Sequence, residues 1–134
     1  MTKTCHKHTK ILRRQTTPGA RAEHLAANYL IKQGLQLIES NYYSSCGEID
    51  LIMRHNQTLV FVEVRHRSNS RYGGAAASIT TRKLQKIRNT AYHYIQRRNI
   101  SADTPVRVDA LCVNGEIDSR ALAFDWITDI VQDC

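Results

Sequence analysis

Asp50, Glu63 and Arg65 are charged residues within a stretch of mostly aliphatic and aromatic side chains. Successive residues of a strand point to opposite faces, so Glu63 and Arg65 share a predicted face with Phe61. Both faces of this strand are largely apolar, which predicts cover on both sides and makes an embedded charge costly. Glu63 therefore needs a partner, and its chemistry depends on what stands beside it.

The turn before this strand decides whether the two acids meet. If Asn56-Gln57 is a two-residue hairpin loop, Asp50 lies directly across from Glu63 on the same face. Two adjacent carboxylates repel each other unless a cation lies between them. A three-residue loop would instead oppose Asp50 to Val62 and send the acids to opposite faces. Both loops stay open, because Asn-Gln is a weaker turn signal than Asn-Gly.

The overall composition predicts one globular domain. The chain has 134 residues and 42% hydrophobic content, and no apolar run approaches the length of a membrane span. The first residues lack the apolar centre of a secretory signal, so a cytoplasmic location is expected. Four cysteines without any CxxC pair argue against a disulfide framework or a structural zinc site.

The net charge of +7 is concentrated rather than diffuse. Residues 1–17 are basic without any acid, whereas residues 103–134 are mainly acidic. Such a concentration attracts polyanions, of which nucleic acid is the commonest large one. The main basic block, residues 64–102, contains no acid and holds Arg65, Arg67, Arg71, Arg82, Lys83, Lys86, Arg88, Arg97 and Arg98.

Local patterns predict the elements around these residues. Residues 1–16 are interpreted as a disordered basic arm and 17–134 as one domain. Thr17-Pro18 predicts a helix start and Gly34 its end. The remaining elements are predicted as a strand over 35–40, a connection over 41–45, a hairpin from Gly47 to Arg67, a loop over 68–78, a helix from Thr80 or Thr81 to Arg98, a strand over 106–112, a turn at Asn114-Gly115, and a strand or short helix over 120–130.

The second predicted helix begins with an unusual charge. Arg82, Lys83, Lys86 and Arg88 place cations in its first turns, where they oppose the helix macrodipole. They do not stabilise the helix, and this favours a binding role. The loop before it contains Arg71-Tyr72-Gly73-Gly74, which is either a phosphate-contacting loop or an ordinary connection.

The order of acids and elements resembles the restriction-endonuclease-like nuclease core, whose signature is an acid on one strand and (Asp/Glu)-x-Lys on the next. More closely, the chain resembles the YraN family of small bacterial proteins, and more distantly the archaeal Holliday junction resolvases. The resemblance implies an α/β fold with a mixed central sheet flanked by helices, in the order α-β-β-β-α-β with a C-terminal extra element. It covers about residues 18–113 and is carried by Pro18-Gly19 to Gly34, Gly47-Glu48-Ile49-Asp50-Leu51-Ile52, Leu59-Val60-Phe61-Val62-Glu63-Val64-Arg65, Arg67, Tyr72-Gly73, Lys83, Lys86-Ile87 and Ala91.

The resemblance also implies roles for single residues. Asp50 and Glu63 would be metal-binding carboxylates, and the Val64 backbone carbonyl a further ligand, for Mg²⁺ or Mn²⁺. Arg65 stands where the signature has lysine; it could stabilise charge but cannot act as a base. Nucleic acid would be bound by Arg67, Arg71, Arg82, Lys83 and Lys86, and the accessory candidates are Glu23, Glu48 and Gln85.

Three functions follow from these patterns. The first is a metal-dependent endonuclease acting on DNA or structured nucleic acid, with DNA ahead of RNA. The second is a non-catalytic nucleic-acid-binding module with the same fold. The third is a structural protein in which Asp50 and Glu63 only pair with Arg65 or Arg67. Resolvases of similar fold dimerise, so a homodimer is left open.

Overall fold

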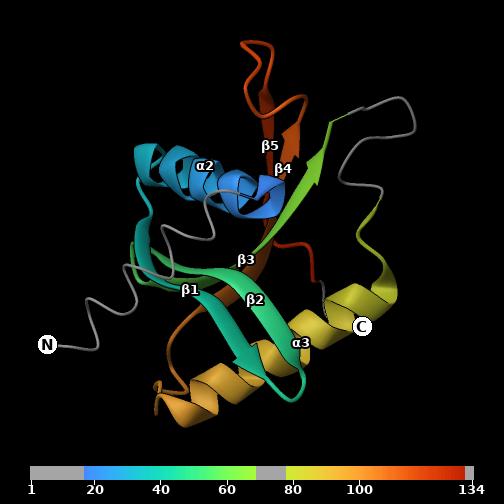
Figure 1. Cartoon of the computed structure of the whole chain (residues 1–134). Helices are drawn as coiled ribbons and strands as arrows, with labels where there is room; N and C mark the ends of the chain where they lie inside the picture. The colour runs from blue at the N-terminus through green and yellow to red at the C-terminus, as the bar shows by residue number, and fades with distance from the viewer. Residues whose placement is uncertain (1–16, 69–77, 132–134) are drawn as a thin grey trace, which may run out of the picture.

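The protein is an α/β structure in which one sheet separates two helices (Figure 1). The structure, a computed structural model, describes residues 17–68 and 78–131, so the predicted arm and most of the loop over 68–78 lie outside the described residues. The sheet has the order β1-β2-β3-β4-β5, and the chain order α-β-β-β-α-β-β confirms the predicted class. The elements are α2 (Pro18–Lys32), β1 (Gln36–Ser44), β2 (Gly47–His55), β3 (Thr58–Arg67), α3 (Thr81–Arg97), β4 (Val106–Asn114) and β5 (Ala123–Ile127).

Both helices begin where the sequence predicts. Thr17 caps α2 by accepting a hydrogen bond from the Ala20 amide at 3.1 Å, and Pro18 costs nothing at the first helical position because its missing N–H has no partner there. Thr80 caps α3 in the same way through the Lys83 amide, also at 3.1 Å. After α2, Gly34 has a φ of +103°, a value that favours glycine.

The predicted connection over residues 41–45 is wrong for most of its length. Residues 41–44 continue β1, and Tyr42 pairs with Ile49 of β2. The run is polar because β1 is an edge strand, where only one side of the backbone needs a partner strand. A register shift between Leu37 and Glu39 interrupts the strand further and hides its period from the sequence pattern.

The hairpin of β2 and β3 has the register that the two-residue loop predicts. His55 faces Thr58, and Leu51 faces Val62. Asn56 adopts a φ of +56° in the turn, which asparagine tolerates better than most residues. Asp50 and Glu63 lie one position beyond Leu51↔Val62, the last pair of this ladder.

The remaining strands give the sheet its mixed character. β3 pairs in parallel with β4 from Leu59↔Val106 to Arg67↔Asn114, and α3 makes the long crossover that a parallel pair requires. β4 pairs antiparallel with β5. The C-terminal segment, predicted as a strand or a short helix, is therefore a strand.

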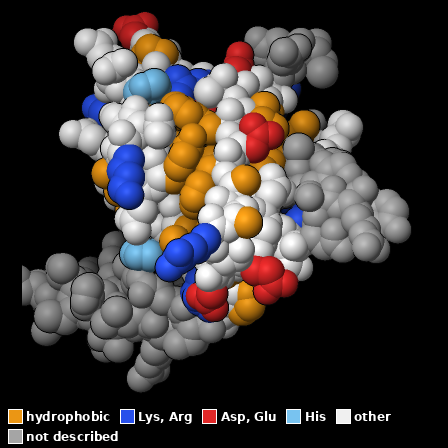
Figure 2. All heavy atoms as spheres, turned by 90° about the horizontal axis from the view of Figure 1, so that it is seen from above, with side chains coloured by type: hydrophobic (Ala, Val, Ile, Leu, Met, Phe, Trp, Pro, Cys, Tyr) orange, Lys and Arg blue, Asp and Glu red, His pale blue; other side chains and the backbone are white. Residues whose placement is uncertain are grey.

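Alternating residues of the central strands pack into two separate cores. Val60 and Val62 belong to the core beneath α2, whereas Phe61 packs with Ile87 beneath α3. Figure 2, seen from the α2 side, shows a strip of hydrophobic side chains bordered by charged ones. Half-buried aromatic residues of β5, such as Phe124, pack against the core beneath α2.

Asp109 is a buried acid that the sequence patterns did not single out. Its carboxylate accepts from Arg107 Nε at 3.0 Å, from Trp126 Nε1 at 2.9 Å and from the Asp129 amide at 2.9 Å. These bonds join β4, β5 and the chain after β5. Because the Asp109 carboxylate is occupied by donors from three parts of the chain, it supports the fold rather than a site.

Asp109→Asn is expected to destabilise the protein by about 1–3 kcal/mol, because an amide nitrogen would face at least one buried donor and leave it unpaired. Urea unfolding should show this as a lower midpoint, with Asp125→Asn as a control because Asp125 is exposed on β5. Equal midpoints for the two variants would mean that the Asp109 bonds do not support the fold.

Candidate functional site

Asp50 and Glu63 meet on the α3 side of the sheet. They lie one position beyond Leu51↔Val62, the last pair of the β2–β3 ladder, and their side chains are only 9% and 3% exposed. Each carboxyl group acts on the pKa of the other. Two buried carboxylates repel each other, so the pair is favoured when one of the two groups carries a proton.

Asp50 is the member that holds the proton. Burial and the neighbouring charge of Glu63 raise the pKa of Asp50 to about 8, although the Val64 amide acts in the opposite direction. That amide donates to Asp50 Oδ2 at 2.8 Å. A side chain of β2 thus takes the place of a backbone acceptor at the point where the β2–β3 ladder ends.

Glu63 lies between its partner acid and two cations. Arg65 Nη1 is 3.3 Å and Lys83 Nζ is 3.7 Å from the same oxygen, Glu63 Oε2. Burial raises the pKa of Glu63, and Lys83 and Arg65 oppose that rise. The site therefore combines two carboxyl groups with two positive side chains, one from β3 and one from α3.

Arg65 is held in place by the residue before α3. Its Nε donates to Ser78 Oγ at 2.9 Å, and its Nη2 donates to the Ser78 carbonyl oxygen at 3.3 Å. No local pattern predicts the Ser78 contact, because it joins β3 to a residue 13 positions further along the chain, just before α3. The guanidinium is therefore oriented before any ligand arrives.

The other predicted residues are spread more widely. Glu48 is close enough for its charge to raise the pKa of Asp50. Glu23 is half-buried on α2, the helix of the opposite face. The exposed residues are Arg67 at the end of β3 and Arg82, Gln85 and Lys86 on α3, where Gln85 donates to Asn89 at 3.4 Å; Arg71 lies outside the described residues.

Lys83 makes a contact that the sequence did not predict. The sequence placed it with the nucleic-acid-binding cations, but the structure brings its ammonium to Glu63. Helical spacing alone cannot reveal this contact, since it depends on how α3 crosses β3. Arg67, which the structural alternative offered as a partner of the acids, is exposed at the strand end.

The site offers few protein ligands for a metal ion. Among residues 17–68 and 78–131, no group of three or more His, Cys, Asp and Glu side chains could hold one. Two carboxylates are available, and both are hard oxygen donors of the type that Mg²⁺ prefers. Mg²⁺ usually keeps several waters and binds through one or two carboxylates, so Asp50 and Glu63 fit such an ion.

No helix in the described part of the chain is long and apolar enough to cross a membrane.

Sequence comparison gives consistent relatives. Residues 22–113 match the model of a family described as "Uncharacterised protein family UPF0102". A UPF0102 protein of Legionella pneumophila is 49% identical over 98 residues, which is 73% of this chain and 83% of the relative. One from Nitrosomonas europaea is 48% identical over 81% of this chain and 88% of its own. One from Psychromonas ingrahamii is 43% identical over 95% and 99%.

Proposed function

The chain belongs to the uncharacterised protein family UPF0102, and on that premise we propose that it is a metal-dependent nuclease that hydrolyses phosphodiester bonds of DNA or structured nucleic acid. One observation carries the proposal: two buried carboxyl groups in direct contact, beside two cations. A pair that serves only the fold would lose little by being replaced with apolar side chains. A pair that binds a cation needs both acids.

A divalent ion would take the place of the proton that the acids now share. Asp50 and Glu63 would bind it through oxygen. The N–H and C=O of a strand residue point to the same neighbouring strand, and the Val64 amide points to Asp50, so the Val64 carbonyl is the third candidate ligand. When bound, Mg²⁺ or Mn²⁺ would polarise a phosphate oxygen and acidify a water molecule.

Arg65 and Lys83 would together take the role that the lysine of the nuclease signature has. Arg65 stays charged at every working pH, so it stabilises negative charge on the phosphate and takes no proton. Lys83 supplies a compact ammonium, 3.7 Å from Glu63, close to where a lysine of the signature would be needed. The departure at position 65 is thus offset by a lysine from α3.

The exposed cations of α3 extend the site towards a polyanion. Arg82 and Lys86 lie in the first turns of this helix, close in sequence to Lys83. Phosphate contacts of this kind give affinity without sequence preference. DNA is the first substrate to test, with RNA second, and a homodimer would place two such sites on one substrate.

The double variant Arg82→Gln/Lys86→Gln should bind nucleic acid more weakly and with a lower salt dependence, by about one unit of slope for each lost phosphate contact. Lys83 is left intact in this variant because of its contact with Glu63. Affinity would be measured by fluorescence anisotropy from about 50 to 200 mM salt. The control is Arg54→Gln/Arg120→Gln, which removes the same charge from exposed positions outside α3. Equal losses in both variants would exclude α3 as the contact surface.

Activity is tested on purified protein with Mg²⁺ or Mn²⁺. The substrates are branched, nicked, duplex and single-stranded DNA, and the corresponding RNAs. Cleavage that requires the metal supports the nuclease. One observation favours the alternative, a non-catalytic binding module: Arg65 replaces the signature lysine and is tied to Ser78. Tight nucleic-acid binding with neither cleavage nor Mn²⁺ affinity would select that alternative.

A further inference from the structure

Ser78 holds the Arg65 side chain by two of its nitrogens. Arg65 Nε donates to Ser78 Oγ at 2.9 Å, and Arg65 Nη2 donates to the Ser78 carbonyl oxygen at 3.3 Å. A hydroxyl and a carbonyl oxygen of one residue thus occupy one side of the guanidinium. Because the guanidinium is planar and rigid, holding one side fixes the direction in which the other side points.

The guanidinium keeps donors for a ligand. Of its five N–H groups, one on Nε and one on Nη2 are held by Ser78, and one on Nη1 donates to Glu63 Oε2 at 3.3 Å. Each terminal nitrogen, Nη1 and Nη2, therefore keeps one N–H without a partner among the residues that the structure describes. Two donors on neighbouring nitrogens can bind two oxygens of one phosphate side by side. The Arg65 side chain is 28% exposed, so a ligand can reach it.

The residue type at position 65 makes such a holder necessary. A lysine ammonium is compact and turns its three donors freely, whereas an arginine binds phosphate well only when its planar fork faces the oxygens. Arg65 stands where the nuclease signature has lysine. Ser78 provides the orientation that an ammonium would not require.

The start of α3 fixes Ser78 in turn. Ser78 lies two residues before the N-cap Thr80, whose hydroxyl accepts from the Lys83 amide at 3.1 Å. Lys83 Nζ and Arg65 Nη1 contact the same oxygen, Glu63 Oε2, at 3.7 and 3.3 Å. The short segment from Ser78 to Lys83 therefore places both cations of the site beside the carboxyl pair.

We propose that Ser78 is a positioning residue of the nuclease, which turns the two remaining donors of Arg65 towards the two non-bridging oxygens of the phosphate that is cleaved. Ser78 contacts no substrate and acts only through Arg65. This inference rests on the proposed function, since it concerns the same site and the same substrate. It assigns to one serine the orientation that allows an arginine to stand in place of the signature lysine.

The test is a double-mutant cycle on metal-dependent cleavage of the substrate that the parent cleaves. Ser78→Ala should lower kcat/KM by about tenfold or more, the loss expected when a hydrogen bond to a charged group is removed. The loss should fall mainly on kcat, because overall affinity comes from the exposed cations of α3. In the Arg65→Lys background Ser78→Ala should have little effect, since an ammonium does not use the Ser78 contacts. Ser78→Thr, which keeps the hydroxyl, should retain most of the activity.

A second measurement follows Arg65 without any reaction. In nuclear magnetic resonance spectra, the Nε–H signal of Arg65 is identified by its absence from Arg65→Lys. This proton should exchange slowly with water in the parent and in Ser78→Thr, and faster in Ser78→Ala.

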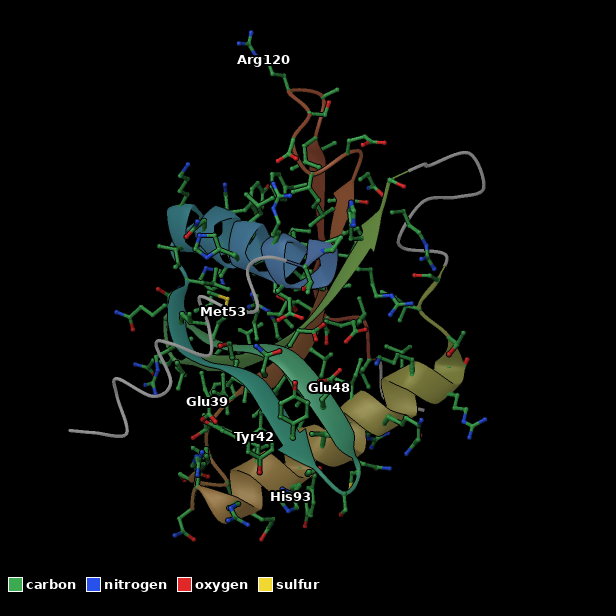
Figure 3. The ribbon with its side chains drawn as sticks, in the orientation of Figure 1. Glu39, Tyr42, Glu48, Met53, His93 and Arg120 are labelled. Atoms are coloured by element: carbon green, nitrogen blue, oxygen red, sulfur yellow. The ribbon has the colours of Figure 1, made fainter. Side chains whose placement is uncertain are left out.

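The matched control is Ser119→Ala. The Ser119 hydroxyl also accepts a hydrogen bond, from the Ala121 amide at 3.0 Å. Its neighbour Arg120 lies at the tip of the connection between β4 and β5, far from α3 (Figure 3). This variant should change neither kcat nor the Arg65 signal.

Two results would overturn the inference and leave the proposed function intact. One is an equal loss of activity from Ser78→Ala in the parent and in the Arg65→Lys background. The other is an Arg65 Nε–H that exchanges equally fast in the parent and in Ser78→Ala. A parent that cleaves no substrate would refute the proposed function itself, and the role of Ser78 with it. If thermal unfolding shows that Ser78→Ala does not fold, Ser78→Cys takes its place with the same expectations, because sulfur is only a weak acceptor.

Discussion

Asp50→Asn is expected to stabilise the folded protein above neutral pH and to abolish Mn²⁺ binding. The pKa of Asp50 is about 8 in the folded protein, against an ordinary value of 3.8. Between these values the folded state keeps a proton that the unfolded chain has released. The contribution of this proton to the free energy of unfolding is therefore fully present below about pH 4. It falls as the pH rises through this window, by at most about 1.4 kcal/mol per pH unit.

Asparagine removes this loss because its side chain is neutral at every pH. Its oxygen can still accept from the Val64 amide, and its NH₂ group can donate to Glu63 as the protonated carboxyl group does. Urea unfolding at several pH values between 3.8 and 8 would measure the difference.

Two controls belong to this experiment. Asp103→Asn removes an acid from an exposed turn and should leave the pH dependence of the parent unchanged. Mn²⁺ should stabilise the parent, because a ligand that binds only the folded state adds to its stability, and it should leave Asp50→Asn unaffected. A parent whose stability is flat across the same pH range would contradict the shared proton.

Glu63→Gln is expected to lower metal-dependent cleavage by about a thousandfold or more, since it removes a negative ligand on which the transition-state charge balance depends. Nucleic-acid affinity should change little, because the exposed cations of α3 remain. Arg65→Lys should preserve or raise cleavage, as an ammonium is more compact than a guanidinium. Cleavage rates and anisotropy on the same substrate would measure both effects.

One pattern of results would replace the nuclease with the binding module. The parent and Arg65→Lys would both be inactive on every substrate, and Glu63→Gln would lower the melting temperature. Glu63 would then be a structural partner of Arg65 and Lys83, the two cations that contact it. Retained Mn²⁺ binding by an inactive parent would instead point to a substrate not yet tried.

The parts of the site that depend on neighbouring residues could be predicted from the sequence up to the choice of loop. Of the two loop lengths that the sequence left open, the two-residue loop is the one that forms, and strand pairing then determines which side chains share a face. The helix starts at Thr17 and Thr80 follow from capping, which is equally local. Local rules of this kind need no knowledge of the tertiary fold.

The missed features all depend on distant parts of the chain. Lys83 reaches Glu63 only because α3 crosses β3 at one particular place, and Ser78 meets Arg65 from 13 residues further along the chain. The role of Asp109 depends on Arg107 and Trp126, which donate to its carboxylate. The length of β1 was hidden by the register shift of an edge strand.

The separation of the two cores by the sheet has a practical consequence for single-molecule work. Lys83 and the carboxyl pair lie on the α3 side, whereas α2 covers the opposite face. A fluorophore or a surface tether on the outer side of α2, for example at the exposed Asn28, would point away from α3. The protein could then be immobilised in one orientation with its α3 side turned towards solution.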